Sequence, residues 1–299
     1  MTYREGKCLA NCGFCAQARR SRGRADMLSR VSWPDYPTEV VLDGIEKACK
    51  NTKIRRVCIQ ALNYPEVFSD VLALVKAILS RVQVPVSISC QPLNRGDLQK
   101  LANAGAERIG IPLDAATRQI FDEVKGRSVG GPYSWDRQFE LLSEAIEFFG
   151  KGKVSTHLIA GLGETERELI NIIQRCVDMG VLPALFAFTP IRGTALQDRR
   201  QPQTQSYRRI QIARHLVLHR LARYEDMLFD GLGCLTDFGV PEQVLKEITQ
   251  RGEPFLTSGC PDCNRPYYNE KPSGPIYNFP RKPMKSELLE IQDEVFGVS

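Results

Sequence analysis

The sequence lacks long hydrophobic segments, low-complexity tracts and internal repeats. One of its longest apolar runs, Val181–Phe188, contains Pro183 and is much shorter than the roughly 18 to 20 residues of a membrane helix. No secretory signal pattern opens the chain. Neither sign of charge dominates, since 40 Lys and Arg residues stand against 35 Asp and Glu residues, which gives no support to nucleic-acid binding. We therefore expect a cytoplasmic protein that binds neither membranes nor nucleic acid.

The remaining composition is that of an ordinary globular protein. Of 299 residues, 42% are hydrophobic and 25% are charged, which excludes disordered, collagen-like and coiled-coil classes. This length suits either one α/β barrel or two domains. The ten cysteines are unusual for a cytoplasmic protein. Because disulfides are not the default there, they are expected to be metal ligands, catalytic groups or small buried residues.

Short apolar segments alternate with segments that have apolar residues at helical spacing. The expected strands are Thr2–Lys7, Ile54–Gln60, Val84–Cys90, Glu107–Pro112, Val154–Ala160, Ala184–Phe188, Asp226–Asp230 and Glu253–Thr257. The expected helices are Thr38–Asn51, Glu66–Arg81, Arg95–Ala104, Ala115–Lys125, Ser134–Phe149, Glu164–Met179, Gln205–Tyr224, Pro241–Gln250 and Ser286–Phe296. Eight such units predict a parallel (β/α)8 barrel, an α/β fold with functional residues at the carboxyl ends of its strands. We expect the barrel over residues 1–258 and a C-terminal extension of the same compact unit over residues 259–299.

The first cysteine cluster follows the first expected strand. Cys8, Cys12 and Cys15 have the spacing C-x3-C-x2-C. Three thiolates in one loop can bind three irons of a [4Fe–4S] cluster and leave the fourth iron without a protein ligand. Zinc is the alternative, but it would need a distant fourth ligand.

This motif, with Phe14 before its last cysteine, resembles that of radical S-adenosylmethionine (SAM) enzymes. The segments Ile191–Leu196 and Gly161–Thr165 and the strand order are similar to the biotin synthase branch of that family. The resemblance implies that Cys8, Cys12 and Cys15 bind a [4Fe–4S] cluster whose open iron chelates SAM. One electron then cleaves SAM to a 5′-deoxyadenosyl radical.

The resemblance also assigns residues to SAM. Arg137 matches the arginine that pairs with the SAM carboxylate, Asp114 matches the aspartate that binds the ribose, and Ile159 lies in the strand expected beside the adenine. Pro112 stands where the branch often has a polar ribose contact. Local interpretations compete with these roles: Arg137 could be a solvated helix residue, and Asp114 could be the N-cap of the helix from Ala115.

A second set of cysteines lies near other strand ends. Cys58 lies in the second strand, Cys90 ends the third, and Cys260 and Cys263 follow the eighth. In a closed barrel the eighth strand adjoins the first, so these four thiols can converge. We interpret them as ligands of an auxiliary [4Fe–4S] cluster, with half a zinc site and buried apolar cysteine as alternatives. The remaining cysteines, Cys49, Cys176 and Cys234, are expected to be structural, and the three histidines are not expected to be ligands.

Comparison with the resembling family refines the expected reaction. Cys58 and Cys90 match two ligands of the auxiliary [2Fe–2S] cluster of biotin synthase, whereas its other two ligands fall near Ser155 and Leu232. Lipoyl synthases of the one-protein kind carry an N-terminal cysteine motif, and only seven residues precede Cys8 here. The chain looks most like the two-protein type of lipoyl synthase, which inserts sulfur into a carrier-bound octanoyl or mercaptooctanoyl chain. Biotin synthase-type sulfur insertion, a radical SAM enzyme with a structural second cluster, and a non-catalytic metal protein are the alternatives.

The resemblance implies several partners. These are an octanoylated carrier protein or lipoyl domain, a sister lipoyl synthase protein, and an electron donor such as ferredoxin or flavodoxin. Four arginines after the first cysteines, Arg19, Arg20, Arg22 and Arg24, predict a basic surface that could steer an acidic carrier.

Overall fold

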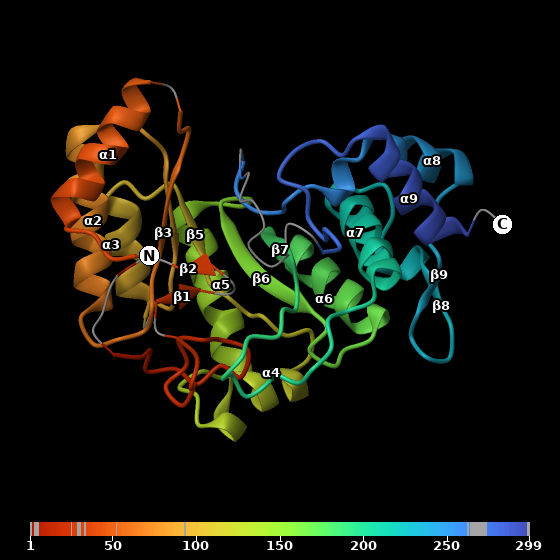
Figure 1. Ribbon diagram of the computed structural model, residues 1–299, viewed down its shortest axis with the longest axis horizontal. Coiled ribbons are helices and arrows are strands. Elements are labelled where there is room, and N and C mark those ends of the chain that lie inside the picture. The colour runs from red at the N-terminus through yellow and green to blue at the C-terminus, as the bar shows by residue number, and fades with distance from the viewer. Residues whose placement is uncertain are drawn as a thin grey trace.

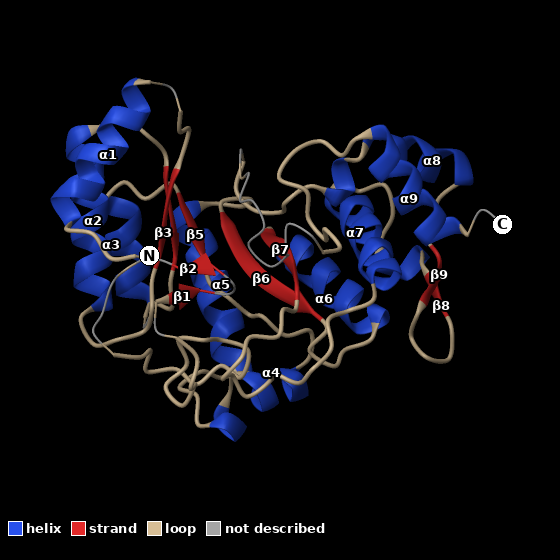
Figure 2. Ribbon diagram, viewed as in Figure 1, coloured by secondary structure: helices blue, strands red, loops and turns tan. Residues whose placement is uncertain are grey.

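The computed structural model describes Thr2 and residues 6–24, 26–28, 31–32, 34–51, 53–92, 94–261, 263 and 274–297. Its centre is a five-stranded parallel sheet in the order β3-β4-β5-β6-β7. The strands are β3 (Val57–Gln60), β4 (Val86–Ser89), β5 (Arg108–Gly110), β6 (Val154–Ala160) and β7 (Val181–Ala187). Figure 2 shows α1 (Thr38–Lys50), α2 (Val67–Arg81) and α3 (Arg95–Asn103) beside the β3 edge of this sheet.

The remaining helices continue the alternation of strand and helix. They are α4 (Arg118–Val124), α5 (Trp135–Phe149), α6 (Glu166–Met179), α7 (Thr204–Leu218), α8 (Glu242–Arg251) and α9 (Lys285–Phe296). Local chemistry sets their ends: Thr165 and Glu168 form a capping box at the start of α6, and Gly180 ends that helix with φ +85°. In Figure 1, α8 and α9 lie beyond α7, at the far end of the molecule from α1.

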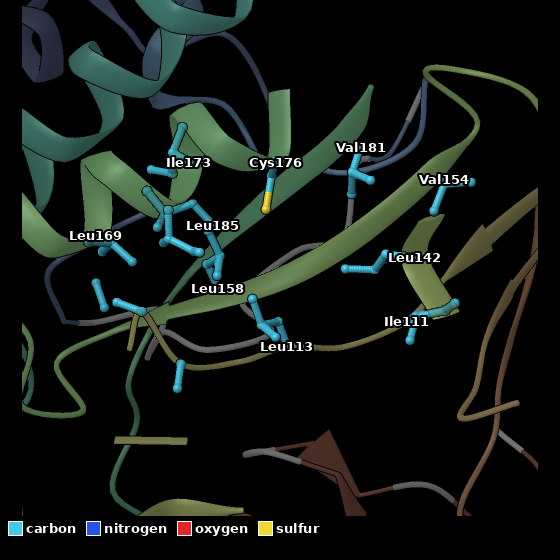
Figure 3. Packing of buried hydrophobic residues seen from close by; sticks show 14 of the residues in the cluster. Ile111, Leu113, Leu142, Val154, Leu158, Leu169, Ile173, Cys176, Val181 and Leu185 are labelled. Carbon is cyan, nitrogen blue, oxygen red and sulfur yellow. The ribbon is translucent and has the colours of Figure 1, made fainter. Parts of the chain in front are cut away.

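The core lies between the convex face of the sheet and its covering helices. Leu158 of β6 and Leu185 of β7 are at most 2% exposed and pack against Leu169 and Ile173 of α6, as Figure 3 shows. The side chains of a parallel strand alternate between two faces. Burying alternate residues under helices therefore leaves the other set on the concave face, where a site can form.

The two edges of the sheet are continued by irregular chain. At the β3 edge, the backbone N–H of Thr2 donates to Gln60 O (2.8 Å), and the Thr2 hydroxyl accepts from Leu62 N (3.1 Å). At the β7 edge, the Ser258 hydroxyl accepts from Leu185 N (2.7 Å) and donates to Leu185 O (3.0 Å). The chain after α8 therefore runs beside β7 and carries Cys260 toward the concave face.

The α/β fold is the expected one, but two expected strands do not join the sheet. The segment 226–230 holds β8 (Leu228–Phe229), which pairs antiparallel with β9 (Leu235–Asp237). The Asp230 carboxylate accepts from Leu232 N and Cys234 N and so favours this local hairpin. The segment 253–257 begins with the 3-10 turn Glu253–Phe255, which has a proline in its first positions. The expected first strand extends over residues 3–5, which lie outside the described residues.

Smaller elements complete the described chain. β1 (Met27–Leu28) and β2 (Val31–Ser32) form an antiparallel pair. Two 3-10 turns, Arg127–Val129 and Tyr224–Asp226, lie between helices and strands. In the part of the chain that the structure describes, each helix is too short or too polar to cross a bilayer.

Candidate functional site

The loop of Cys8, Cys12 and Cys15 is folded by its own backbone. Cys8 N donates to Gln17 O (2.9 Å), and Cys15 N donates to Cys12 O (3.0 Å). The backbone N–H of Asn63, beyond the end of β3, donates to the Cys8 sulfur (3.3 Å). A donor at this position stabilises a thiolate. The strand end and the loop thus present the cysteines together, as a shared cluster requires.

A second loop holds the cysteine loop from outside. Leu196 N donates to Gly13 O (3.0 Å), and Arg22 N donates to Gly193 O (2.8 Å). Gly193 has φ +85°, and a Cβ there would lie 2.5 Å from the backbone nitrogen of Gly23. The segment Ile191–Leu196, which carried part of the family resemblance, therefore positions the cysteine loop by close backbone contact.

All three cysteines of the loop line a cavity of about 230 Å³ at the carboxyl ends of the strands. The lining also includes Asp114 and Ile159, both expected at the SAM site. Apolar groups make up much of the rest: Phe14, Leu62, Val67, Phe186, Phe188 and Ile191. A largely apolar cavity with few polar groups is the usual form of a small-molecule site.

Burial makes the thiols of Cys12 and Cys15 reluctant to ionise without a metal. It raises the pKa of Cys15 to about 11, against the effect of the Gln17 backbone N–H. It also raises the pKa of Cys12, against the effect of the Lys125 ammonium. Metal ligation requires thiolates, and bound iron would supply the positive charge that stabilises them. Three thiols in one loop therefore fit a [4Fe–4S] cluster with one iron left for SAM.

Lys125 is a residue of this cavity that the sequence reasoning missed. Its side chain is 1% exposed, and its Nζ donates to Asp114 Oδ2 (2.8 Å) and to the Pro112 carbonyl. Asp114 has φ +67°, a left-handed conformation that strains most residues other than glycine. Its backbone pairs with β6 on both sides, donating to His157 O and accepting from Ile159 N. The buried ion pair fixes Asp114 at the cavity wall.

The interpretation of Asp114 as a helix N-cap is wrong. Helix α4 begins at Arg118, and the Thr117 side chain caps it by accepting from Ile120 N (3.2 Å). The two residues between Asp114 and Thr117 are not helical, because the Asp114 backbone is held by β6.

Arg137 lies on α5 outside the cavity lining. It forms ion pairs with Glu140 and Glu144, both at 3.0 Å, on a partly exposed face of the helix. Its neighbour Gln138 is buried instead and donates to Gln91 Oε1 and Pro112 O, both at 3.0 Å. The face of α5 that is turned toward the cavity wall therefore carries Gln138. Arg137 points away from it, so the structure does not bring Arg137 to Asp114 and Ile159.

The second set of cysteines divides between the two faces of the sheet. Cys58, Cys260 and Cys263 line one cavity of about 210 Å³ on the concave face. Cys90 lines a different cavity, beside α2 and α3. Cys90 comes two residues after Ile88 and four after Val86, so the alternation of side chains places all three on the same face. Val86 and Ile88 are at most 1% exposed and belong to the core. The expectation that all four cysteines converge is therefore wrong for Cys90.

The strands set the other residues of this second cavity. Register places Cys58 beside Ser87, and Ser87 beside Arg108, so the three side chains form one row across β3, β4 and β5. Ser155 of β6 also lines the cavity. Leu232 is 81% exposed in the turn of the β8–β9 hairpin and is not part of the lining.

The two cavities adjoin. Gln60, Ser89 and His157 line both of them. The His157 ring packs edge-on against Phe186, with 5.0 Å between ring centres. The loop thiols and the thiols of Cys58, Cys260 and Cys263 thus line neighbouring cavities with a common wall.

The remaining cysteines and histidines lie elsewhere. Cys49 is on α1, Cys176 is fully buried on α6, and Cys234 is in the β8–β9 hairpin. His215 and His219 contact each other at the end of α7, with 4.2 Å between ring centres. Within the described residues, no group of three or more His, Cys, Asp and Glu side chains is arranged to bind a single metal ion.

The fold and the cysteine loop at the sheet's carboxyl end define the class of protein. The sequence profile of the Radical SAM superfamily matches residues 6–176, more than half of the chain. The chain therefore belongs to the Radical SAM superfamily. Membership implies a [4Fe–4S] cluster and SAM as cofactors, and an enzyme of radical chemistry.

Curated relatives are biotin synthases at low identity. The chain is 23% identical over 203 residues to the biotin synthase of Persephonella marina, a match that covers 66% of this chain and 56% of that protein. It is 26% identical over 203 residues to the biotin synthase of Corynebacterium glutamicum, covering 67% and 56% of the two chains. The chain thus spans little more than half the length of these relatives.

Solved structures show the same fold. The FeFe-hydrogenase maturase HydG from Carboxydothermus hydrogenoformans superposes with a TM-score of 0.53 at 16% identity, over 72% of this chain and 49% of that one. Methylornithine synthase (PylB) superposes with a TM-score of 0.53 at 18% identity, over 71% and 59% of the two chains.

Proposed function

We propose that the protein inserts sulfur into an unactivated C–H bond of an octanoyl or mercaptooctanoyl chain carried on a protein. The observation that supports this is the shared interior of two thiol-lined cavities. Gln60, Ser89 and His157 belong to both linings, so a substrate between them faces the loop cysteines on one side and a second set of thiols on the other.

When bound, the cluster and SAM supply a 5′-deoxyadenosyl radical that abstracts a hydrogen atom from carbon. The chain's own residues position the reactants and exclude water. Asp114 is held by Lys125 at the wall of the first cavity, where its free acceptor capacity suits the ribose hydroxyls. Ile159, Phe186 and Phe188 form an apolar wall that suits adenine and a hydrocarbon chain. A sulfide of an auxiliary cluster in the second cavity would be the sulfur donor.

The surface beside the cysteine loop suits a protein partner. Arg20, Arg22, Arg24 and Arg192 line an open depression that also contains Cys12 and Gly13. All four arginines are exposed. This basic depression would attract an acidic carrier protein or lipoyl domain, and its place beside the cluster loop also suits an electron donor such as ferredoxin or flavodoxin. A sister lipoyl synthase protein would complete the two sulfur insertions.

Sulfur insertion into dethiobiotin is the second candidate function, because the curated relatives are biotin synthases. The two positions that match the remaining biotin synthase ligands do not favour it. Ser155 offers a hydroxyl in place of a thiol, and Leu232 is exposed outside the second cavity.

A competition assay tests the proposal. Anaerobically purified protein with SAM and a reductant is given an octanoylated lipoyl domain, a mercaptooctanoyl lipoyl domain and dethiobiotin, and products are identified by mass spectrometry. We expect 5′-deoxyadenosine together with sulfur on one carrier-bound chain. Biotin as the sulfur-containing product would favour the second candidate. 5′-Deoxyadenosine without sulfur transfer to any substrate would contradict both.

A further inference from the structure

The second cavity contains three thiols and is open toward the substrate position. Cys58 lies on β3, whereas Cys260 and Cys263 follow the segment that runs beside β7. The Cys260 sulfur is 3.3 Å from the Ser87 hydroxyl of β4, so the C-terminal pair reaches across the interior to the row that contains Cys58. Three sulfur donors in one cavity favour a soft or borderline metal centre.

A fourth thiol does not reach this cavity. Three of the ten cysteines belong to the first loop, and Cys90, which follows β4, lines the separate cavity beside α2 and α3. Cys49 and Cys176 lie on helices outside the sheet, and Cys234 lies in the β8–β9 hairpin. The segment 264–273 contains no cysteine. A centre in the second cavity therefore has three cysteine ligands at most.

Two arginines line the cavity, and one of them is paired with a carboxylate. Arg56 donates to the Ser87 hydroxyl (3.0 Å) and to Glu107 (2.6 Å), and Arg108 donates to Gly152 O (2.7 Å). The Nε of each is buried and has no hydrogen-bond partner among the described residues. A buried donor without a partner destabilises the folded protein. Two such donors beside three thiols indicate an anionic group that the described side chains do not supply.

We infer that Cys58, Cys260 and Cys263 bind an auxiliary [4Fe–4S] cluster whose fourth iron has no cysteine ligand, with Arg56 and Arg108 balancing its negative charge. The choice of a cluster over zinc rests on the proposed function, since only a cluster contains sulfide to donate. Anionic thiolates and sulfides accept hydrogen bonds from buried arginine donors. The missing cysteine leaves one iron for Ser87 or for a substrate group.

Metal content of paired variants tests this assignment. The parent is the full-length Cys8→Ala/Cys12→Ala/Cys15→Ala variant, purified anaerobically, and Cys58→Ala, Cys260→Ala and Cys90→Ala are added singly. We expect about four irons and four sulfides per parent chain. Cys90→Ala should retain them, whereas Cys58→Ala and Cys260→Ala should lose most of them. Two controls detect misfolding. One is the Cys58→Ser variant, whose side chain has a similar volume, and the other is the circular dichroism spectrum of each variant.

Different results would overturn different parts of this inference. Iron lost in Cys90→Ala as fully as in Cys58→Ala, at equal helix content, would overturn the three-cysteine assignment. Zinc in place of iron, or no metal in the parent, would overturn the cluster itself. If the cluster is present as assigned and wild-type protein transfers no sulfur, the proposed function fails and the metal site stands.

Discussion

At the scale of single residues, the buried pair of Lys125 and Asp114 shapes the wall of the cavity that the three loop cysteines line. Both side chains are removed from water, at 1% and 9% exposed, and the pair ties the wall of the cavity to α4. A buried charge is tolerated only with its partner. The pair therefore supports both the fold and the site.

Asp114→Asn tests this pair. Asparagine tolerates the left-handed backbone of this position but leaves the Lys125 ammonium without a counter-charge. We expect a loss of about 3 kcal/mol in the free energy of unfolding, measured by urea denaturation. Asp136→Asn, which breaks the exposed pair with Arg118, is the matched control and should cost under about 1 kcal/mol. Equal losses in the two variants would contradict the account.

His215 gives a pH dependence at the same scale. Burial lowers its pKa from 6.5 to about 4, aided by His219 and Arg214. Between those two pH values the unfolded chain binds a proton at this position that the folded chain does not, so acid favours unfolding. We expect stability to fall as the pH is lowered from 6.5 toward 4. His215→Gln should lose less stability than wild type between pH 6.5 and 5, and identical slopes in thermal unfolding would refute this.

The limits of sequence-based prediction are also clearest at single residues. The C-x3-C-x2-C spacing is local, so it predicts a cluster loop without knowledge of the fold. The face of the sheet on which Cys90 lies depends on which residues of β4 point into the core. Val86 and Ile88 are buried there, so Cys90 lies on the same face. Lys125 carried no sequence signal, because its role depends on the unusual backbone of Asp114, which long-range pairing with β6 imposes.

At the scale of elements, two loops far apart in sequence form the cluster site together. The cysteine loop and the segment Ile191–Leu196 exchange backbone hydrogen bonds, and Gly193 lies against the backbone of Arg22 and Gly23. The cysteine loop is therefore held in part by backbone that cannot move aside, in addition to side-chain hydrogen bonds such as that from Lys7 Nζ to Ala16 O.

Gly193→Ala tests that support. Its Cβ would lie 2.5 Å from Gly23 N, in addition to the strain of φ +85°. We expect the iron content of the first cluster to fall strongly. Gly150→Ala has a similar φ of +87° but meets no atom within 4 Å, so it should cost about 1 kcal/mol of stability and retain its iron. Full iron in purified Gly193→Ala would show that this contact is not needed.

The five parallel strands were predictable because each is an apolar run between turn signals. The segments 226–230 and 253–257 have similar composition but different partners. The Asp230 carboxylate closes the segment 226–230 into a hairpin with the residues that follow it. Pro254 belongs to a 3-10 turn at the start of the segment 253–257. The C-terminal pair of cysteines still reaches the sheet, because Ser258 substitutes a side-chain hydroxyl for strand pairing.

At the scale of the whole molecule, the basic depression beside the cysteine loop is separated from the C-terminal helices. Figure 1 shows the red N-terminal loop below the sheet near α4, and α8 and α9 beyond α7. Arg20 and Arg22 are exposed and lie beside Cys12 and Gly13 of the cysteine loop. The charge of these arginines would change the rate at which a partner protein associates, with little effect on the stability of the fold.

Arg20→Gln/Arg22→Gln should slow turnover of a carrier-bound substrate severalfold at low salt and weaken the salt dependence of kcat/KM. Lys282→Gln/Lys285→Gln removes the same charge at the C-terminal end and is the control. Steady-state assays over a range of ionic strength check this. An unchanged salt dependence in the arginine variant would exclude steering by this surface.

The central claim is that both thiol-lined cavities serve one reaction. The most direct measurement is a single-turnover assay of wild type and Cys58→Ala with octanoylated lipoyl domain, SAM and reductant, in which 5′-deoxyadenosine and sulfur incorporation are quantified together. The account predicts both products from wild type, and 5′-deoxyadenosine without sulfur incorporation from Cys58→Ala. Equal sulfur incorporation by the two proteins would contradict it.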